Sequence, residues 1–200
     1  MSKRKRQGVT GKESRLRLLE AAAEEFASNG FHQTKVSNIV ARAGVTQPAF
    51  YLYFESKEAA FAELVEDFRK GLSQVVRNGH ILPGKNRADL KEAVVKSLEE
   101  IYTYLAANPA LTTIGLFQSS ASTEIKAEIA GLMEQNLIQE QQSGYYRHDL
   151  DTVFTAECLL GIVERLTLTQ LLSGRESPLQ LARRTQDLFF YGILDVHHRN

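Results

Sequence analysis

The sequence contains little that could cross-link the chain or hold a metal. Cys158 is the only cysteine among 200 residues, so no intramolecular disulfide can form. No closely spaced cysteine and histidine residues occur, which excludes a structural zinc site, and we expect neither a metal nor a cofactor. The longest apolar run, residues 158–163, is far too short for a membrane span, and no apolar stretch follows the basic N-terminus as a signal peptide requires. We therefore expect a soluble, cytoplasmic protein without a membrane partner.

The chain also lacks net charge, but its charges are unevenly distributed. Lys and Arg together number 24, and so do Asp and Glu. The first 60 residues hold 10 basic and 6 acidic residues, whereas the rest of the chain holds 14 and 18. The first 17 residues alone carry seven basic residues against one acidic residue, Glu13. This asymmetry is consistent with an N-terminal end of the chain that binds a polyanion, and it is equally consistent with a solvated basic tail.

Hydrophobic periodicity predicts an all-α fold of about nine helices, three of them short. Apolar residues recur at the i, i+3, i+4, i+7 spacing of amphipathic helices, and no useful period-2 run or hairpin signal occurs. Side-chain caps are predicted at Thr10, Thr34, Thr46, Ser56 and Ser177. The predicted helices cover about 11–29, 36–43, 47–53, 57–77, 88–106, 109–116, 122–142, 152–172 and 178–195.

The second and third of these helices, with a glycine corner at Gly44 between them, have the layout of a helix-turn-helix. Helical hairpins with a glycine turn also occur in proteins that do not bind DNA, so the residue identities are needed to distinguish a DNA-binding motif from other hairpins. The informative residues are Leu19-Glu20-Ala21-Ala22, Phe26, Gly30-Phe31, Thr34, Ile39, Ala43-Gly44-Val45, Tyr51-Leu52-Tyr53-Phe54 and Ser56-Lys57-Glu58. Because of these residues, the segment 19–61 resembles the N-terminal domain of TetR-family (TetR/AcrR) transcriptional regulators.

The resemblance implies a DNA-binding transcriptional regulator and not an enzyme. It implies a repressor that binds a palindromic operator as a homodimer and is released by a small-molecule effector of unknown identity. Lys35, Pro48 and Ala49 depart from the common family pattern, which leaves the operator sequence open. The implied domains are a basic arm (1–11), a helix-turn-helix domain (12–56, motif about 35–54), a linking fourth helix (57–79) and a ligand-binding and dimerisation domain (80–200).

The predicted DNA contacts are residues that point outward from a small core. Gln47 can pair with adenine through two hydrogen bonds, and Ala49 can contact a thymine methyl group. Lys57 lies beside first-turn N–H groups that favour phosphate. Tyr51 and Tyr53 lie about 200° apart on a helix and cannot both face the groove; the resemblance implies that Tyr51 binds the backbone, while Tyr53 binds a phosphate or packs. The full predicted set is Lys35, Ser37, Thr46, Gln47, Pro48, Ala49, Tyr51, Tyr53 and Lys57.

Two other parts of the predicted DNA-binding region have structural interpretations. The basic residues 3–6 either enter the minor groove as an arm or stay disordered without DNA. Gly44 is expected where a sharp turn leaves little room for a Cβ. The core that holds the three helices together is predicted from Ala22, Phe26, Ile39, Ala43 and Phe54.

The larger domain is predicted to dimerise and to bind a ligand. A short recognition helix contacts few base pairs, so two copies of the chain are needed to bind an operator. The interface between them is predicted from the last two helices, 152–172, which is apolar nearly all round, and 178–195. These helices form either a four-helix interface with the second copy or ordinary core. Arg165 pairs either with an anionic effector or in a salt bridge. Cys158 is either a buried apolar side chain or a thiol sensor. The predicted ligand residues, for which plain core is the alternative, are Tyr102, Leu105, Leu116, Phe117, Met133, Leu137, Cys158, Ile162, Arg165 and Leu166.

Two further classes of protein compete with the regulator. One is an all-α enzyme or carrier of an apolar substrate, although no nucleophile, base or metal constellation occurs at recognisable spacing. The other is a helical interaction module whose basic end meets an acidic protein or a membrane. Sequence-dependent DNA binding that weakens steeply with salt distinguishes the regulator from both, since neutralising phosphates releases counterions.

Overall fold

The computed structural model describes residues 11–193, so the predicted arm and the predicted cap Thr10 lie outside the described residues. Within this range the chain forms nine α-helices and two short π-helical segments, without strands, which confirms the all-α prediction. The α-helices are α1 (Gly11–Asn29), α2 (Val36–Ala43), α3 (Gln47–Tyr51), α4 (Lys57–Asn78), α5 (Arg87–Ala107), α6 (Pro109–Thr113), α7 (Ser122–Gln142), α8 (Thr152–Leu166) and α9 (Pro178–Tyr191); the π-helical segments are η1 (Ile114–Gln118) and η2 (Thr167–Leu171).

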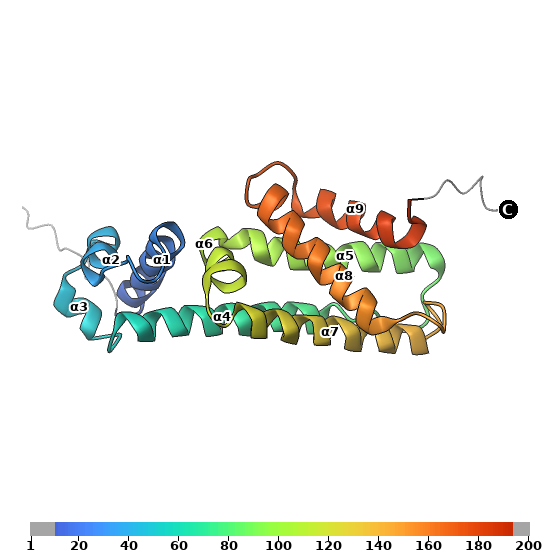
Figure 1. Ribbon diagram of the computed structural model, residues 1–200, viewed down its shortest axis with the longest axis horizontal. Coiled ribbons are helices and arrows are strands. Elements are labelled where there is room, and N and C mark those ends of the chain that lie inside the picture. The colour runs from blue at the N-terminus through green and yellow to red at the C-terminus, as the bar shows by residue number, and fades with distance from the viewer. Residues whose placement is uncertain (1–10, 194–200) are drawn as a thin grey trace, which may run out of the picture.

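The helices form an elongated molecule with a small head at one end. The head consists of α1, α2 and α3, and the other helices form a larger bundle (Figure 1). In the bundle α9 packs along α5 and α8 packs along α7. The long helix α4 contacts α1 in the head and both α5 and α7 in the bundle. It is therefore a direct mechanical connection between the two parts.

Two of the predicted threonine caps are absent. The hydroxyl of Thr34 donates to the carbonyls of Glu25 (3.0 Å) and Gly30 (2.8 Å), so it closes the end of α1 and does not cap α2. Lys35 is the N-cap residue of α2, without a side-chain cap bond. Thr46 occupies the N-cap position of α3, but its side chain makes no cap hydrogen bond either. Both predictions were wrong; for Thr34 the reason is that a hydroxyl near a helix start has competing carbonyl partners, here those of Glu25 and Gly30.

The serine caps are confirmed. Ser56 accepts a hydrogen bond from the N–H of Ala59 at the start of α4. Ser177 and Gln180 form a reciprocal capping box at the start of α9. These two caps fix where the longest helix of the molecule and its final helix begin.

Four predicted helix ends need correction. The third helix ends at Tyr51 and is followed by a turn. The predicted helices 109–116 and 152–172 each change to π-helix partway, because a wider turn inserts an extra residue without ending the helix. The last helix ends at Tyr191, before residue 195, because the backbone leaves helical geometry at Gly192, whose φ is +67°.

Candidate nucleic-acid interface and ligand cavity

An apolar core holds the three helices of the head together. All five predicted core residues are buried, at 7% exposure or less. Sequence reasoning missed Phe50, which is 0% exposed and lies 5.3 Å from Phe54, ring centre to ring centre. Its spacing of four residues before Phe54 is the signal that could have found it. Because Phe50 points inward, the rest of α3 is presented outward.

The corner between α2 and α3 depends on Gly44. Its φ is 67°, a region that side chains with a Cβ rarely adopt. The N–H of Val45 donates to the carbonyl of Val40 at 3.0 Å, which closes the end of α2 as a Schellman motif does. The chain therefore turns within three residues, 44–46, and enters α3.

The outward surface of the head gathers most of the predicted DNA-contacting residues on α2, α3 and the corner between them. Tyr51 is 52% exposed, while Tyr53 and Ala49 are half-buried. The remaining exposed members of the predicted set are Lys35, Ser37, Thr46, Gln47 and Pro48. In Figure 1 the helices α2 and α3 lie at the end of the molecule farthest from α9. The surface is therefore open to a large partner.

Lys57 has a structural partner that the sequence did not reveal. Its Nζ donates to the carbonyls of Phe31 (2.8 Å) and Thr34 (2.9 Å) and lies 4.4 Å from the centre of the Phe31 ring. Two of the three N–H groups of the ammonium therefore tie the α1–α2 connection to α4, and one remains for a further acceptor.

Some basic residues of the head already bind carboxylates. Arg15 pairs with Glu63 at 2.6 Å, and Arg42 pairs with Glu24 and Glu25 at 2.6 Å. The hydrogen bonds from Arg42 to Glu25 and Glu24 raise the pKa of its guanidinium. Exposed cations that make no ion pair with a described residue remain at Lys12, Arg17 and Lys35.

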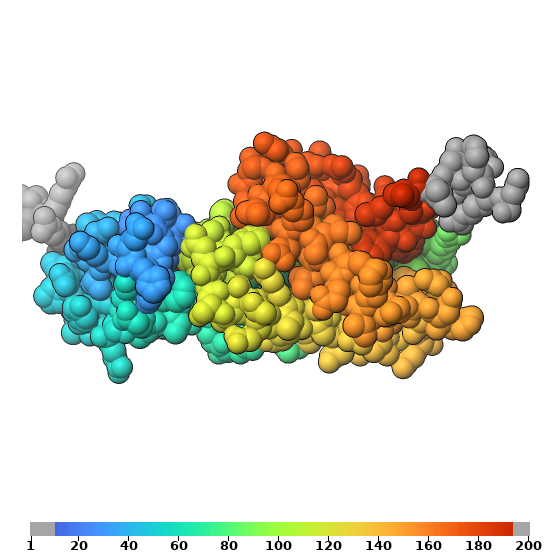
Figure 2. Space-filling view, viewed as in Figure 1, coloured from blue at the N-terminus to red at the C-terminus, as the bar shows by residue number. Residues whose placement is uncertain are grey.

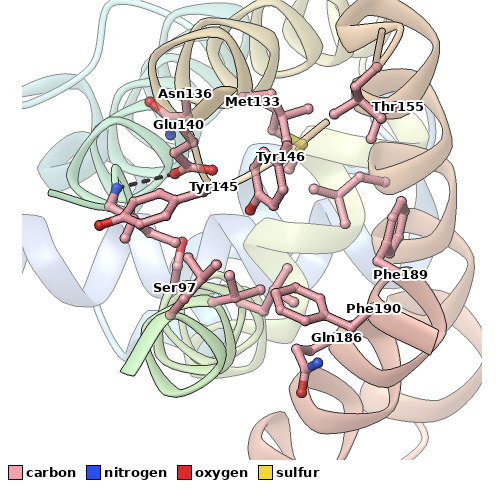
Figure 3. Close-up of a pocket in the computed structure, with 18 of the residues that line it drawn as sticks. Ser97, Met133, Asn136, Glu140, Tyr145, Tyr146, Thr155, Gln186, Phe189 and Phe190 are labelled. Atoms are coloured by element: carbon pink, nitrogen blue, oxygen red, sulfur yellow. Dashed lines mark hydrogen bonds between the residues drawn. The ribbon is translucent and has the colours of Figure 1, made fainter. Parts of the chain in front are cut away.

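A cavity of about 620 Å³ lies in the bundle between α5, α7, α8 and α9 and is bordered at one end by the connections around residues 79–86 and 144–150. This volume is within the range of about 300–1,000 Å³ that small-molecule sites occupy. Figure 3 shows Asn136, Glu140 and Tyr145 on one side of it and Phe189 on the other. Much of the remaining wall is aliphatic: Val76, Ile81, Leu90, Val94, Leu98, Ile101, Leu137, Leu150 and Leu159.

Only Met133 and Leu137 of the predicted ligand residues line this cavity. The hydroxyl of Tyr102 lies 3.2 Å from that of Thr185 within the packed core. Arg165 is exposed on α8 and Cys158 is half-buried. Leu105 and Leu116 are buried in the core, Phe117 and Leu166 pack against its edge, and Ile162 is half-buried on α8.

The polar end of the cavity is built around Glu140, which is 5% exposed. Its carboxylate accepts a hydrogen bond from the N–H of Ile81 (3.1 Å) and one from the phenol of Tyr146. Burial raises the pKa of the carboxyl to about 7, and the Ile81 and Tyr146 hydrogen bonds oppose this only in part. Burial, followed by the charge of Glu140, also raises the pKa of Tyr146. Sequence reasoning missed both residues.

Hydrogen bonds hold the α4–α5 connection against the start of the α7–α8 connection. The hydroxyl of Tyr145 donates to the carbonyl of Leu82 (2.7 Å) and accepts from the N–H of Lys85 (2.8 Å). Three exposed cations, Lys85, Arg87 and Arg147, border the cavity at this end, and Arg147 also pairs with Asp149 at 2.9 Å. The mouth is therefore basic while the interior is mostly apolar.

One amide of the cavity wall is unsatisfied. Gln186 is 5% exposed, and its Nε2 has no hydrogen-bond partner among the described residues. In Figure 3 the amide is turned away from Glu140.

Residues 11–193 contain no cluster of His, Cys, Asp or Glu that could hold a metal ion, and none of their helices has the length and apolarity to cross a bilayer.

The comparisons with known proteins agree with the architecture of the head. Residues 18–64 match the model of the family described as bacterial regulatory proteins, tetR family. The chain is 43% identical over 184 residues, 92% of its length and 94% of the relative's, to the uncharacterized HTH-type transcriptional regulator YdgC of Bacillus subtilis (strain 168). It is 26% identical over 191 residues, 89% of its length and 94% of the relative's, to the fatty acid metabolism regulator protein of the same organism.

Solved structures share the fold. The TetR family transcriptional regulator PfmR from Thermus thermophilus superposes with a TM-score of 0.73, covering 90% of this chain and 100% of that one at 22% identity. The transcriptional regulator FadR from Bacillus subtilis, solved in complex with stearoyl-CoA, gives 0.68, with 90% and 99% covered at 22% identity.

Proposed function

Because the chain belongs to the tetR family of bacterial regulatory proteins, and is a DNA-binding transcriptional regulator and not an enzyme, we propose that it represses transcription as a homodimer on a palindromic operator. A small molecule bound in the bundle cavity releases the operator. The observation that carries this proposal is the outward surface of α3, mounted on a head that α4 connects to the cavity wall.

The head is suited to the major groove. The exposed residues Gln47 and Tyr51 lie on a short helix whose inward side is fixed by Phe50. Such a helix reaches only a few base pairs, and symmetric dimers read two half-sites about 34–36 Å apart, or a multiple of this distance. Gln47 supplies base recognition through two hydrogen bonds to adenine. Tyr51 and Lys35 supply contacts to the phosphates, which position the head.

Two substitutions separate base reading from phosphate binding. Gln47→Ala is expected to cost about 1–3 kcal/mol on the best operator and to relax preference at one base pair. Lys35→Ala is expected to weaken binding to all sequences alike and to lower the salt slope by about 1. Fluorescence anisotropy with operator variants between low and moderate salt measures both effects. An equal loss on every sequence from both substitutions contradicts these roles.

Helix α4 carries the signal between cavity and head. Near its middle, Arg69 binds Glu128 of α7 at 2.7 Å, and the hydroxyl of Ser73 donates to the same carboxylate at 2.7 Å. Near its end, Asn136 of α7 donates to the carbonyl of Val76, a residue of the cavity wall, at 2.8 Å. A ligand that favours another position of α7 therefore favours another position of α4, provided that it binds the two conformations with different affinity.

The effector is an amphipathic anion with a long apolar chain. The aliphatic interior accepts the chain, and the cations Lys85, Arg87 and Arg147 at the mouth attract a carboxylate or phosphate. The fatty acid metabolism regulator among the relatives and the stearoyl-CoA complex of a protein with the same fold support an acyl compound.

Filling the cavity tests whether it is the effector site. Met133→Trp is expected to leave operator binding intact and to abolish release by palmitate or palmitoyl-CoA, because the indole occupies the space of the acyl chain. Leu82→Trp is the control, since Leu82 is 67% exposed and does not line the cavity. Operator binding is measured with and without each compound. Unchanged release from the Met133→Trp protein places the effector elsewhere.

A further inference from the structure

The side chain of Gln186 contains a buried hydrogen-bond donor without an acceptor. The residue is 5% exposed, and its Nε2 forms no hydrogen bond with any described residue. Two other buried side-chain atoms of the described range share this property, in His80 and Thr167, but neither of these residues lines the cavity. Gln186 does line it. The unused donor therefore belongs to the wall of the proposed effector site.

The position of Gln186 limits where an acceptor can come from. In Figure 2 the atoms of α8 and α9 together cover one side of the bundle, and Figure 3 shows Gln186 next to Phe190, across the cavity from Glu140. Bulk water barely reaches a side chain that is 5% exposed, and the described part of the chain provides no acceptor for Nε2. A molecule inside the cavity is the remaining source of an acceptor.

The unpaired amide affects which molecule fits the cavity. A buried N–H group without an acceptor destabilises the structure that contains it. Water inside a cavity can accept such a hydrogen bond. A saturated acyl chain that displaces the water cannot accept it, so the donor is left unpaired when the chain binds. A chain that carries an oxygen atom at this position satisfies the donor and is expected to bind more tightly.

We propose that the effector carries a hydroxyl or keto oxygen on its apolar chain, and that Gln186 recognises this oxygen by donating a hydrogen bond from Nε2. Gln186 is then a specificity-determining residue, which distinguishes an oxygenated acyl chain from the saturated chain of the same length. The inference rests on the proposed function, which places an anionic amphipathic effector in this cavity, and it adds which acyl compounds fit best.

The packing of α9 on α5 indicates where on the acyl chain the oxygen lies. The hydroxyl of Tyr102 on α5 lies 3.2 Å from that of Thr185 on α9. The ammonium group of Lys91 lies 4.6 Å from the centre of the Tyr191 ring. The two helices are therefore antiparallel, and Gln186 lies near the level of Tyr102, about 22 Å along α5 from its start at the basic mouth. With the anionic head at the mouth, an oxygen beside Gln186 lies in the remote half of a chain as long as that of palmitate.

Hydroxylated fatty acids test this inference. Release of the operator is measured by fluorescence anisotropy with palmitate, β-hydroxypalmitate and ω-hydroxypalmitate, and with stearate and 12-hydroxystearate. At least one of the two acids that are hydroxylated in the remote half is expected to release the operator at a concentration at least about tenfold lower than its unsubstituted parent. β-Hydroxypalmitate is expected to show no such gain, because its hydroxyl lies next to the carboxylate.

The variant Gln186→Leu separates recognition of the effector from a structural role. Leucine occupies a similar space without a donor, so the variant is expected to lose the preference for the hydroxylated acid. Its free energy of unfolding in urea, measured without effector, is expected to be no lower than that of the unmodified protein, because no unpaired amide is buried. Gln135→Leu is the control, since Gln135 is exposed on α7 and does not line the cavity; this variant is expected to keep the preference.

The outcomes distinguish this inference from the proposed function. Equal release by hydroxylated and unsubstituted acids overturns the inference, and so does a preference that persists in the Gln186→Leu protein. In both cases release by palmitate leaves the proposed function intact. If none of these acids and no palmitoyl-CoA releases the operator, the proposed effector class and the inference are both wrong.

Discussion

Replacing Phe50 by alanine is expected to destabilise the head by about 3–5 kcal/mol and to abolish DNA binding. The side chain is 0% exposed and lies 5.3 Å from Phe54 and 5.5 Å from Tyr51, ring centre to ring centre. Its removal leaves a cavity under α3 that a helix of five residues cannot close by shifting, because that helix has few other inward contacts. Without this anchor, α3 no longer has a fixed orientation.

The matched control is Leu52→Ala, two residues further along the chain. Leu52 is 80% exposed, so its truncation is expected to change stability by less than about 0.5 kcal/mol. Urea unfolding and operator binding are measured for both variants. If the Phe50→Ala protein binds DNA as the unmodified protein does, Phe50 is not the residue that fixes the orientation of α3.

Replacing Glu140 by glutamine is expected to remove a pH dependence of stability worth about 3 kcal/mol. Burial raises the pKa of this carboxyl from 4.5 to about 7. The folded state therefore holds the proton more tightly than the unfolded chain. The stability that this group contributes is fully present below about pH 4.5 and is lost as the pH rises through about 7.

Urea unfolding at pH 5 and pH 8 checks this expectation. The difference in the free energy of unfolding between the unmodified protein and the Glu140→Gln variant isolates the effect of this carboxyl from that of the other titrating groups. The variant is expected to be relatively more stable at pH 8, since its amide oxygen still accepts a hydrogen bond from the N–H of Ile81. Glu134→Gln, on the same helix and only half-buried, serves as the control. Equal pH dependence in all three proteins shows that Glu140 titrates as an ordinary carboxyl.

The local parts of the fold could be predicted from the sequence. The bounds of α7 follow from Ser122 and from the Ser143-Gly144 pair that ends it, and Ser177 marks the start of α9. The head could be predicted because its core residues and its glycine corner are close in sequence. Thr34 was misassigned because its hydroxyl has a choice of partners, and only the packed end of α1 decides between them.

The cavity could not be predicted, because it is a property of packing between distant segments. Leu105 and Met133 are both apolar, buried residues of long helices, yet only Met133 borders the empty space. The polar end joins Ile81, Glu140 and Tyr146 from three separate segments. Hydropathy alone does not distinguish a residue that lines a cavity from one that fills a core.

The charged residues of α8 show how far a sequence pattern can lead. A charged side chain in an otherwise apolar helix needs solvent or a partner. The structure assigns Glu164 to Lys126 and leaves Glu157 and Arg165 on the outer face. Which side of a helix faces its own bundle depends on the position of α7, and that position is not encoded within α8.

A hydroxyl-radical footprint on a selected operator is the most direct test of the claim that two copies of α3 bind the major groove. Two protected half-sites related by a two-fold axis are expected, with centres about 34–36 Å or a multiple of this distance apart. The same footprint is expected to disappear for the Phe50→Ala protein. A single protected half-site, or uniform protection without a preferred sequence, contradicts the account.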